Sequence, residues 1–95
     1  AGVDPKKTIE KNTENDLVWC KDSFFDKPAY KGKTVIFGHT PTFYLYGHDK
    51  YIKNKKETIV WYDEVNKDKI GIDCGSVYGG KLAALVLPTM QAFYI

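Results

Sequence analysis

The sequence predicts an α+β fold in which one helix precedes about five strands. A chain of 95 residues has room for one domain only. Hydrophobic residues make up 43% of it and aromatic residues 15%, and this aromatic content argues against a disordered protein. Short apolar and β-branched runs alternate with turn signals from residue 34 onward, so we expect consecutive strands paired in an antiparallel or mixed sheet.

The helix is predicted over residues 14–25. Thr13 is a candidate N-cap, because Asp16 stands three positions later, where a negative charge suits the positive end of a helix. Apolar residues then follow at near-helical spacing, namely Leu17, Trp19 or Cys20, and Phe24. The Asp-Lys-Pro sequence at 26–28 ends the helix. We interpret both tryptophans, Trp19 and Trp61, as core residues.

Strands are expected at residues 34–37, 57–62, 69–73, 82–87 and 91–95. The first and the fourth are continuous apolar runs, which predicts strands buried on both faces. The second is β-branched and aromatic, and the third alternates Ile70 and Ile72 with smaller residues. Residues 31–33, 66–68 and 88–90 are predicted turns, and 41–56 is a long connection.

Charge and apolar patterning exclude several classes of protein. The net charge is only +2, and all fourteen basic residues are lysine, so the chain lacks the arginine that usually reads guanine and phosphate. We therefore expect no nucleic-acid partner. The longest apolar run, 82–87, is far shorter than the roughly 20 residues of a membrane helix, so no membrane partner is expected. Without a visible secretory signal, we expect a cytoplasmic protein with Cys20 and Cys74 reduced, although a single bridge between them is the alternative.

Two short motifs carry the functional argument. Gly-His-Thr-Pro at 38–41 follows a predicted strand, and a histidine at that place, His39, stands where sheet proteins hold ligands. Ile-Asp-Cys-Gly-Ser-Val-Tyr-Gly-Gly at 72–80 ends a strand in a glycine loop, where backbone can approach a ligand closely. Each motif alone also fits a plainer interpretation, since a histidine after a strand is often structural and a glycine loop is often only a turn.

Together and in this order, the motifs resemble the C-terminal half of the calcineurin-like metallophosphoesterases. The resemblance is to the bacterial phosphoprotein phosphatase branch, which includes symmetrical diadenosine tetraphosphatases and serine/threonine phosphatases. In that branch Thr and Ala stand where this chain has Cys74 and Ser76. The opening Ala-Gly-Val-Asp-Pro and Asp-Leu-Val-Trp at 16–19 are similar to the family's His-Ala-Gly and Asp-Leu-x-Trp segments. The resemblance runs from residue 1 to about residue 87 and leaves 43–56 unmatched.

The resemblance implies that residues 1–95 form the C-terminal part of a four-layer α/β/β/α domain whose N-terminal half is absent. It implies a phosphoester hydrolase with two divalent metal ions, with Mn²⁺ favoured over Fe²⁺ or Zn²⁺. His39 matches a metal ligand of the family, and Tyr78 matches a position near the bound phosphate. No catalytic residue is assigned within the chain.

The family's other metal-binding segments have no counterpart here, and the chain begins one residue after the expected His of His-Ala-Gly. One histidine cannot hold a metal tightly, so the isolated chain is expected to be inactive. Its expected partners are a phosphorylated substrate, either a phosphoprotein or a dinucleoside polyphosphate, and a covering layer. That layer is the missing half of the domain or a second copy.

The competing hypothesis is a small non-catalytic β-rich binding or assembly module that uses segment 43–56. Lysines 50, 53, 55 and 56 in that segment either attract a polyanionic substrate or are simply solvated. Tyrosines 44, 46 and 51 either stack on a nucleobase or cover the sheet edge. His48 is either a second metal ligand or an exposed loop residue.

Two residues of the second motif have further interpretations. Cys74 is conceivable as a thiol nucleophile, but no base stands near it in the sequence. Asp73 is interpreted first as a carboxylate that braces its loop.

Overall fold

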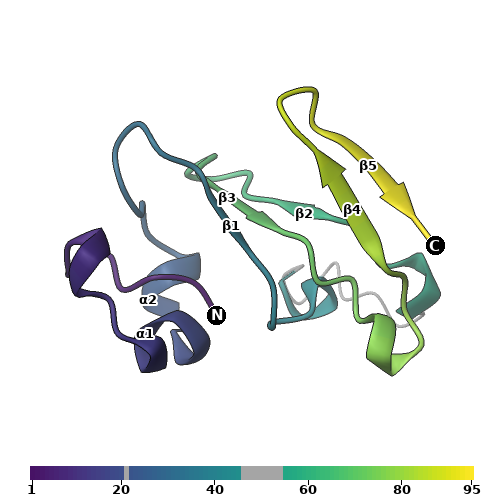
Figure 1. Ribbon diagram of the computed structural model, residues 1–95, viewed down its shortest axis with the longest axis horizontal. Coiled ribbons are helices and arrows are strands. Elements are labelled where there is room, and N and C mark those ends of the chain that lie inside the picture. Colours follow the sequence, from purple (N-terminus) through teal and green to yellow (C-terminus); the bar gives the residue numbers. More distant parts are fainter. Residues whose placement is uncertain (21, 46–54) are drawn as a thin grey trace.

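The computed structural model describes residues 1–20, 22–45 and 55–95 and has the α+β fold that the sequence predicts (Figure 1). Its α-helices are α1 (Glu14–Trp19) and α2 (Asp22–Phe25), and its strands are β1 (Val35–Phe37), β2 (Trp61–Tyr62), β3 (Lys69–Gly71), β4 (Ala83–Val86) and β5 (Gln91–Tyr94). Short 3₁₀ helices lie at Ile9–Lys11, Thr42–Tyr44, Lys55–Glu57 and Ser76–Tyr78.

The strands form two small sheets. In the first, the order is β1-β3-β2, with β1 parallel to β3 and β2 antiparallel to β3. In the second, β4 and β5 form an antiparallel hairpin around the turn after Val86. Figure 1 shows the N-terminal helices and the β4–β5 hairpin at opposite ends of the molecule, with the three-stranded sheet between them. The prediction of a mixed sheet is therefore confirmed.

The predicted single helix over 14–25 is wrong, because the chain leaves helical geometry at Cys20. The start is as predicted: the Thr13 hydroxyl accepts a hydrogen bond from the Asp16 N–H, and the Asp16 carboxylate accepts one from the Thr13 N–H. At Cys20, however, the carbonyl accepts a hydrogen bond from the Ala1 ammonium at 3.0 Å. This carbonyl would bond to residue 24 in a continuous helix, so α1 and α2 are separate helices.

Trp19 lies at the end of α1 and is 62% exposed, so its assignment to the core is wrong. Trp61 does belong to the core, as predicted. Its ring lies 6.1 Å from that of Phe37, which in turn packs on the fully buried Phe24. Phe24 and Phe37 are buried members of the first apolar cluster together with Ala1, and the partly buried Trp61 packs against it; this cluster joins the N-terminal helices to the three-stranded sheet.

A second apolar cluster joins the two sheets. Val60, Ile70 and Cys74 are its buried members, and Leu85 and Ala92 pack against them from the β4–β5 hairpin. Full burial of an aliphatic side chain stabilises a fold by about 1.5–3 kcal/mol. The hairpin is therefore held to the rest of the molecule mainly through its inner face.

Burial of β1 and β4 on both faces is not observed. Burial alternates along both strands, and Ile36 of β1 is 39% exposed. On the hairpin, Val86 and Phe93 are 41% and 53% exposed. The central strand β3 is buried along its whole length, whereas the edge strand β1 and the outer face of the β4–β5 hairpin keep apolar side chains exposed.

The strand predicted over 57–62 is shorter than expected, because its first backbone groups bond to side chains instead of to a neighbouring strand. The Ile59 carbonyl accepts a hydrogen bond from the Thr42 hydroxyl at 2.8 Å, and the Val60 N–H donates to the Tyr94 hydroxyl at 3.1 Å. Lys55–Glu57 form a 3₁₀ turn, and the ladder begins at Trp61.

Both cysteines are free thiols, in agreement with the prediction that they are reduced. Among the residues that the structure describes, no helix has the length and apolar character needed to cross a membrane.

Candidate functional site

The candidate site lies at the edge where β1 and β3 both end. The two strands are parallel and Phe37 pairs with Gly71, so their carboxyl ends share one edge of the sheet. His39 follows β1 by two residues and Asp73 follows β3 by two residues. Carboxyl ends of parallel strands are the usual location of ligand sites in such sheets.

His39 is held in an unusual backbone conformation. Its φ is +69°, and the Thr40 N–H donates a hydrogen bond to the Gly38 carbonyl at 2.8 Å. This i→i+2 bond around a positive φ forms a γ-turn of the rare, strained type. A non-glycine residue in such a conformation costs about 1–3 kcal/mol and persists only where its surroundings enforce it.

The imidazole of His39 is displayed at the surface. The residue is exposed, and within the described ranges its ring nitrogens make no hydrogen bond. Its ring contacts the Trp19 indole edge-on, with centroids 5.6 Å apart and planes at 86°. The plainer interpretation, a hydrogen-bonded structural histidine, therefore does not describe this residue.

Backbone hydrogen bonds join the two motifs into one unit. The Ile72 N–H donates to the Phe37 carbonyl at 3.0 Å, and the Thr42 N–H donates to the Asp73 carbonyl at 2.7 Å. The Asp73 carboxylate accepts the Gly75 N–H at 3.0 Å, which confirms its predicted bracing role. Segments 38–42 and 72–75 consequently lie side by side at the sheet edge.

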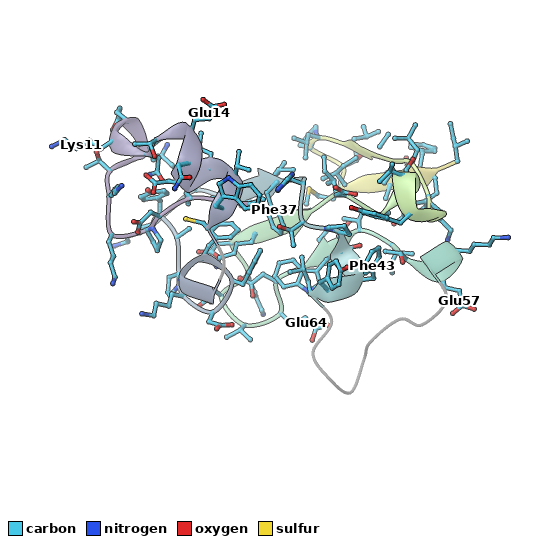
Figure 2. The ribbon with its side chains drawn as sticks, turned by 90° about the horizontal axis from the view of Figure 1, so that it is seen from below. Lys11, Glu14, Phe37, Phe43, Glu57 and Glu64 are labelled. Carbon is cyan, nitrogen blue, oxygen red and sulfur yellow. The ribbon has the colours of Figure 1, made fainter. Side chains whose placement is uncertain are left out.

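The glycine loop is shaped by close packing against Phe43, which is labelled in Figure 2. Gly75 has a φ of +73°, and a Cβ there would stand 2.5 Å from the Phe43 ring. Tyr78 packs on the same ring from the Ser76–Tyr78 turn, with centroids 6.3 Å apart, and is 58% exposed. Tyr78 thus contacts Phe43, whereas His39 contacts Trp19.

Cys74 is a poor nucleophile. It is 1% exposed and belongs to the second apolar cluster. Burial raises the pKa of its thiol, and the nearby Asp73 carboxylate raises it further, although a hydrogen bond with Thr42 opposes both effects. Because the thiolate is the reactive form, the structure favours a packing role.

Ala1 contacts the first motif, and the spacing of the motifs in the sequence did not predict this contact. The Ala1 ammonium donates to the Thr40 hydroxyl at 3.1 Å as well as to the Cys20 carbonyl. Gly2 allows this approach, since its φ is +120° and a Cβ there would overlap the Phe24 ring. In the sequence, the only indication of this contact was the opening Ala-Gly. The fold places these residues beside Thr40, the neighbour of His39.

Several sequence candidates lie outside the described residues: His48, Tyr46, Tyr51, Lys50, Lys53 and the Lys55 side chain. The described members of segment 43–56 include Tyr44, which is 65% exposed and whose ring lies 4.5 Å from that of Phe43, tilted by 56°. Lys56 is exposed.

The described residues do not by themselves fit a metal centre. Within the ranges 1–20, 22–45 and 55–95, no group of three or more His, Cys, Asp or Glu side chains could hold an ion. His39 is a single potential ligand, and metal sites use three or more. We therefore derive no reaction step through a metal from this chain.

Comparison with known proteins adds no relative: no family model matches the chain, and searches of curated proteins and of solved structures return no match.

Proposed function

We propose that the chain belongs to a metal-dependent phosphoester hydrolase of the calcineurin-like family, of serine/threonine protein phosphatase or dinucleoside tetraphosphatase type. One observation carries the proposal: a strained γ-turn displays His39 at the common carboxyl edge of β1 and β3, beside the glycine loop of the second motif. Backbone strain of this kind concentrates at functional sites.

Each residue has a defined part in the proposal. His39 supplies one metal ligand, and the exposed Tyr78 phenol donates a hydrogen bond to a phosphate oxygen. Further metal ligands must come from residues outside the described ranges or from another chain. The Ala1 nitrogen lies 3.1 Å from the Thr40 hydroxyl, so a residue joined to that nitrogen in a longer chain would stand close to His39.

The proposal also includes a cytoplasmic location and a covering layer for the exposed apolar side chains. Free Cys20 and Cys74 suit the reducing cytoplasm. The open outer side chains of β1 and of the hairpin, such as Ile36 and Phe93, suit a covering layer from the other half of the domain or from a second copy.

The test uses the longest form of the protein that its gene encodes. It should hydrolyse p-nitrophenyl phosphate in the presence of Mn²⁺ and lose this activity with EDTA. His39→Asn should lower kcat/KM by about 100-fold or more, the scale of a lost metal ligand or ligand partner. Lys11→Asn, a change at an exposed residue outside the candidate site, is the control and should retain activity.

Absence of divalent-metal-dependent hydrolysis in the longest form would refute the proposal. Full activity of a folded His39→Asn variant would refute the assignment of His39. Circular dichroism of each variant separates loss of the site from loss of the fold.

A non-catalytic assembly module is the second candidate, and the outer face of the β4–β5 hairpin favours it. This face carries the exposed side chains of Leu82, Val86, Phe93 and Ile95, whereas the outer face of a solvated antiparallel sheet is usually polar. If assembly is the function, Phe93→Lys should abolish partner binding in sedimentation experiments and His39→Asn should leave it unchanged.

A further inference from the structure

The edge of the three-stranded sheet opposite His39 has a hollow of its own. The turns before β1 and before β3 meet there, because the strands are parallel and the Val35 N–H donates to the Asp68 carbonyl at 2.8 Å. Between these turns lies a hollow of about 460 Å³. Lys31 and Lys33 line it from the first turn, and Lys67 from the second.

The lining of this hollow carries a net positive charge. Lys31, Lys33 and Lys67 are exposed, and within the described residues none of them forms an ion pair. The hollow's own acidic residue, Asp68, is fully engaged: one carboxylate oxygen accepts from the Lys69 ammonium at 2.6 Å, and the other from the Ala29 N–H at 2.8 Å. Three positive charges therefore line the cavity together with one carboxylate whose oxygens are already bonded, so the hollow is net positive.

Asn66 gives a second, independent indication of a ligand. It belongs to the wall of the hollow, and its side-chain nitrogen is buried with no hydrogen-bond partner among the described residues. Orphaned buried donors are rare and call for an explanation such as a missing ligand or ion. An oxyanion in the hollow would reach this nitrogen only after the amide rotates toward it, because the nitrogen itself is buried.

We propose that this hollow, the lysine pocket (Lys31, Lys33, Asn66 and Lys67), binds a phosphate group. Ammonium groups are compact point charges that donate several hydrogen bonds, and phosphate offers several charged acceptor oxygens to match them. The pocket is independent of the candidate site, because it lies at the opposite edge of the sheet. It adds a phosphate-recognising surface to the protein whether or not the protein is a hydrolase.

The first experiment titrates the ¹⁵N-labelled chain with sodium phosphate, at an ionic strength held constant with NaCl. We expect saturable amide shifts at Gly32, Thr34 and Lys67, and none of this size at Phe93 on the β4–β5 hairpin. Lys33→Gln and Lys67→Gln should each weaken binding by about 1.5- to 5-fold, the effect of removing one exposed charge contact. Lys11→Gln is the matched control, since Lys11 is an exposed lysine that does not line the pocket, and it should leave the affinity unchanged.

A second arm repeats the titration with O-phosphoserine. Tighter binding than that of phosphate supports recognition of a phosphate group carried on a larger molecule, and equal binding supports recognition of the free anion. Asn66→Leu should weaken both, because it removes the buried donor. The proposal fails if NaCl alone reproduces the shifts, if they do not saturate, or if Lys11→Gln weakens binding as much as Lys67→Gln.

Discussion

Replacing the buried Lys69 with methionine should destabilise the chain by about 3 kcal/mol. The Lys69 side chain is fully buried, and its ammonium lies 3.2 Å from an Asp63 oxygen and 2.6 Å from an Asp68 oxygen. It also stands 5.5 Å from the centre of the Phe24 ring. Breaking a buried ion pair by removing one partner costs about 3–5 kcal/mol, because the other charge is left without compensation.

The lower end of that range applies here for two structural reasons. Asp63 keeps two hydrogen bonds when the lysine is removed, from the N–H groups of Val65 and Asn66, both at 3.1 Å. Methionine also resembles the aliphatic part of lysine, so the cavity that remains is small. The net cost is therefore mainly that of leaving the Asp63 carboxylate, whose side chain is 3% exposed, without its cation.

The assay is urea unfolding followed by tryptophan fluorescence, since Trp61 packs in the first cluster. Lys7→Met is the matched control: it also breaks a lysine–aspartate pair, but Lys7 is 42% exposed and the effect should be far smaller. The double variant Lys69→Met/Asp63→Asn should recover part of the lost free energy of unfolding, since it removes the unpaired charge of the Asp63 carboxylate. Equal unfolding midpoints for Lys69→Met and Lys7→Met would refute the reasoning.

Three further predictions concern other parts of the molecule. Gly80→Ala should lower the melting temperature much more than Gly38→Ala, because a Cβ at Gly80 would overlap the Cys74 carbonyl, whereas Gly38 has open space around it and no positive φ. Cys74 should resist iodoacetamide in the native chain and react once urea unfolds it, as mass spectrometry would show, since burial raises its thiol pKa. A hydrogen bond from Lys7 lowers the Asp16 pKa to about 2, so the stabilisation from this carboxylate should be complete above about pH 4 and be lost between about pH 4 and pH 2 in acid-unfolding curves.

The parts of the fold that depend on local sequence were predictable. The Thr13 capping box needs only two side chains three positions apart, and it forms as expected. The β5 strand and the turn at residues 31–33 are set by short-range patterns, and both appear close to their predicted bounds. Local chemistry decides such features, so one sequence suffices to find them.

Features that depend on contacts distant in sequence were missed. The end of α1 depends on the bond from Ala1 to the Cys20 carbonyl, nineteen positions away in sequence. The exposed position of Trp19 follows from that ending. Lys69 is a further example, because nothing in the sequence distinguishes a lysine that is buried between two aspartates from an ordinary surface lysine.

The candidate site was predictable only in part, because it combines local motifs with contacts between residues distant in sequence. The spacing of the motifs located His39 and the glycine loop after their strands, but it did not reveal the positive φ of His39. Nor did it reveal that the Ala1 ammonium contacts the Thr40 hydroxyl. Both are properties of the assembled sheet edge.

The strained backbone of His39 is the most unusual feature of the sheet edge where β1 and β3 end. A glycine would adopt a φ of +69° freely, whereas a residue with a side chain is destabilised in this γ-turn by about 1–3 kcal/mol. The turn is nevertheless fixed on both sides, because Thr40 bonds to Ala1 and Thr42 bonds to the Asp73 carbonyl. The surrounding bonds thus hold an exposed imidazole in a conformation that the residue itself disfavours. The metal-ligand role that we propose for His39 requires a side chain held in a fixed position of this kind.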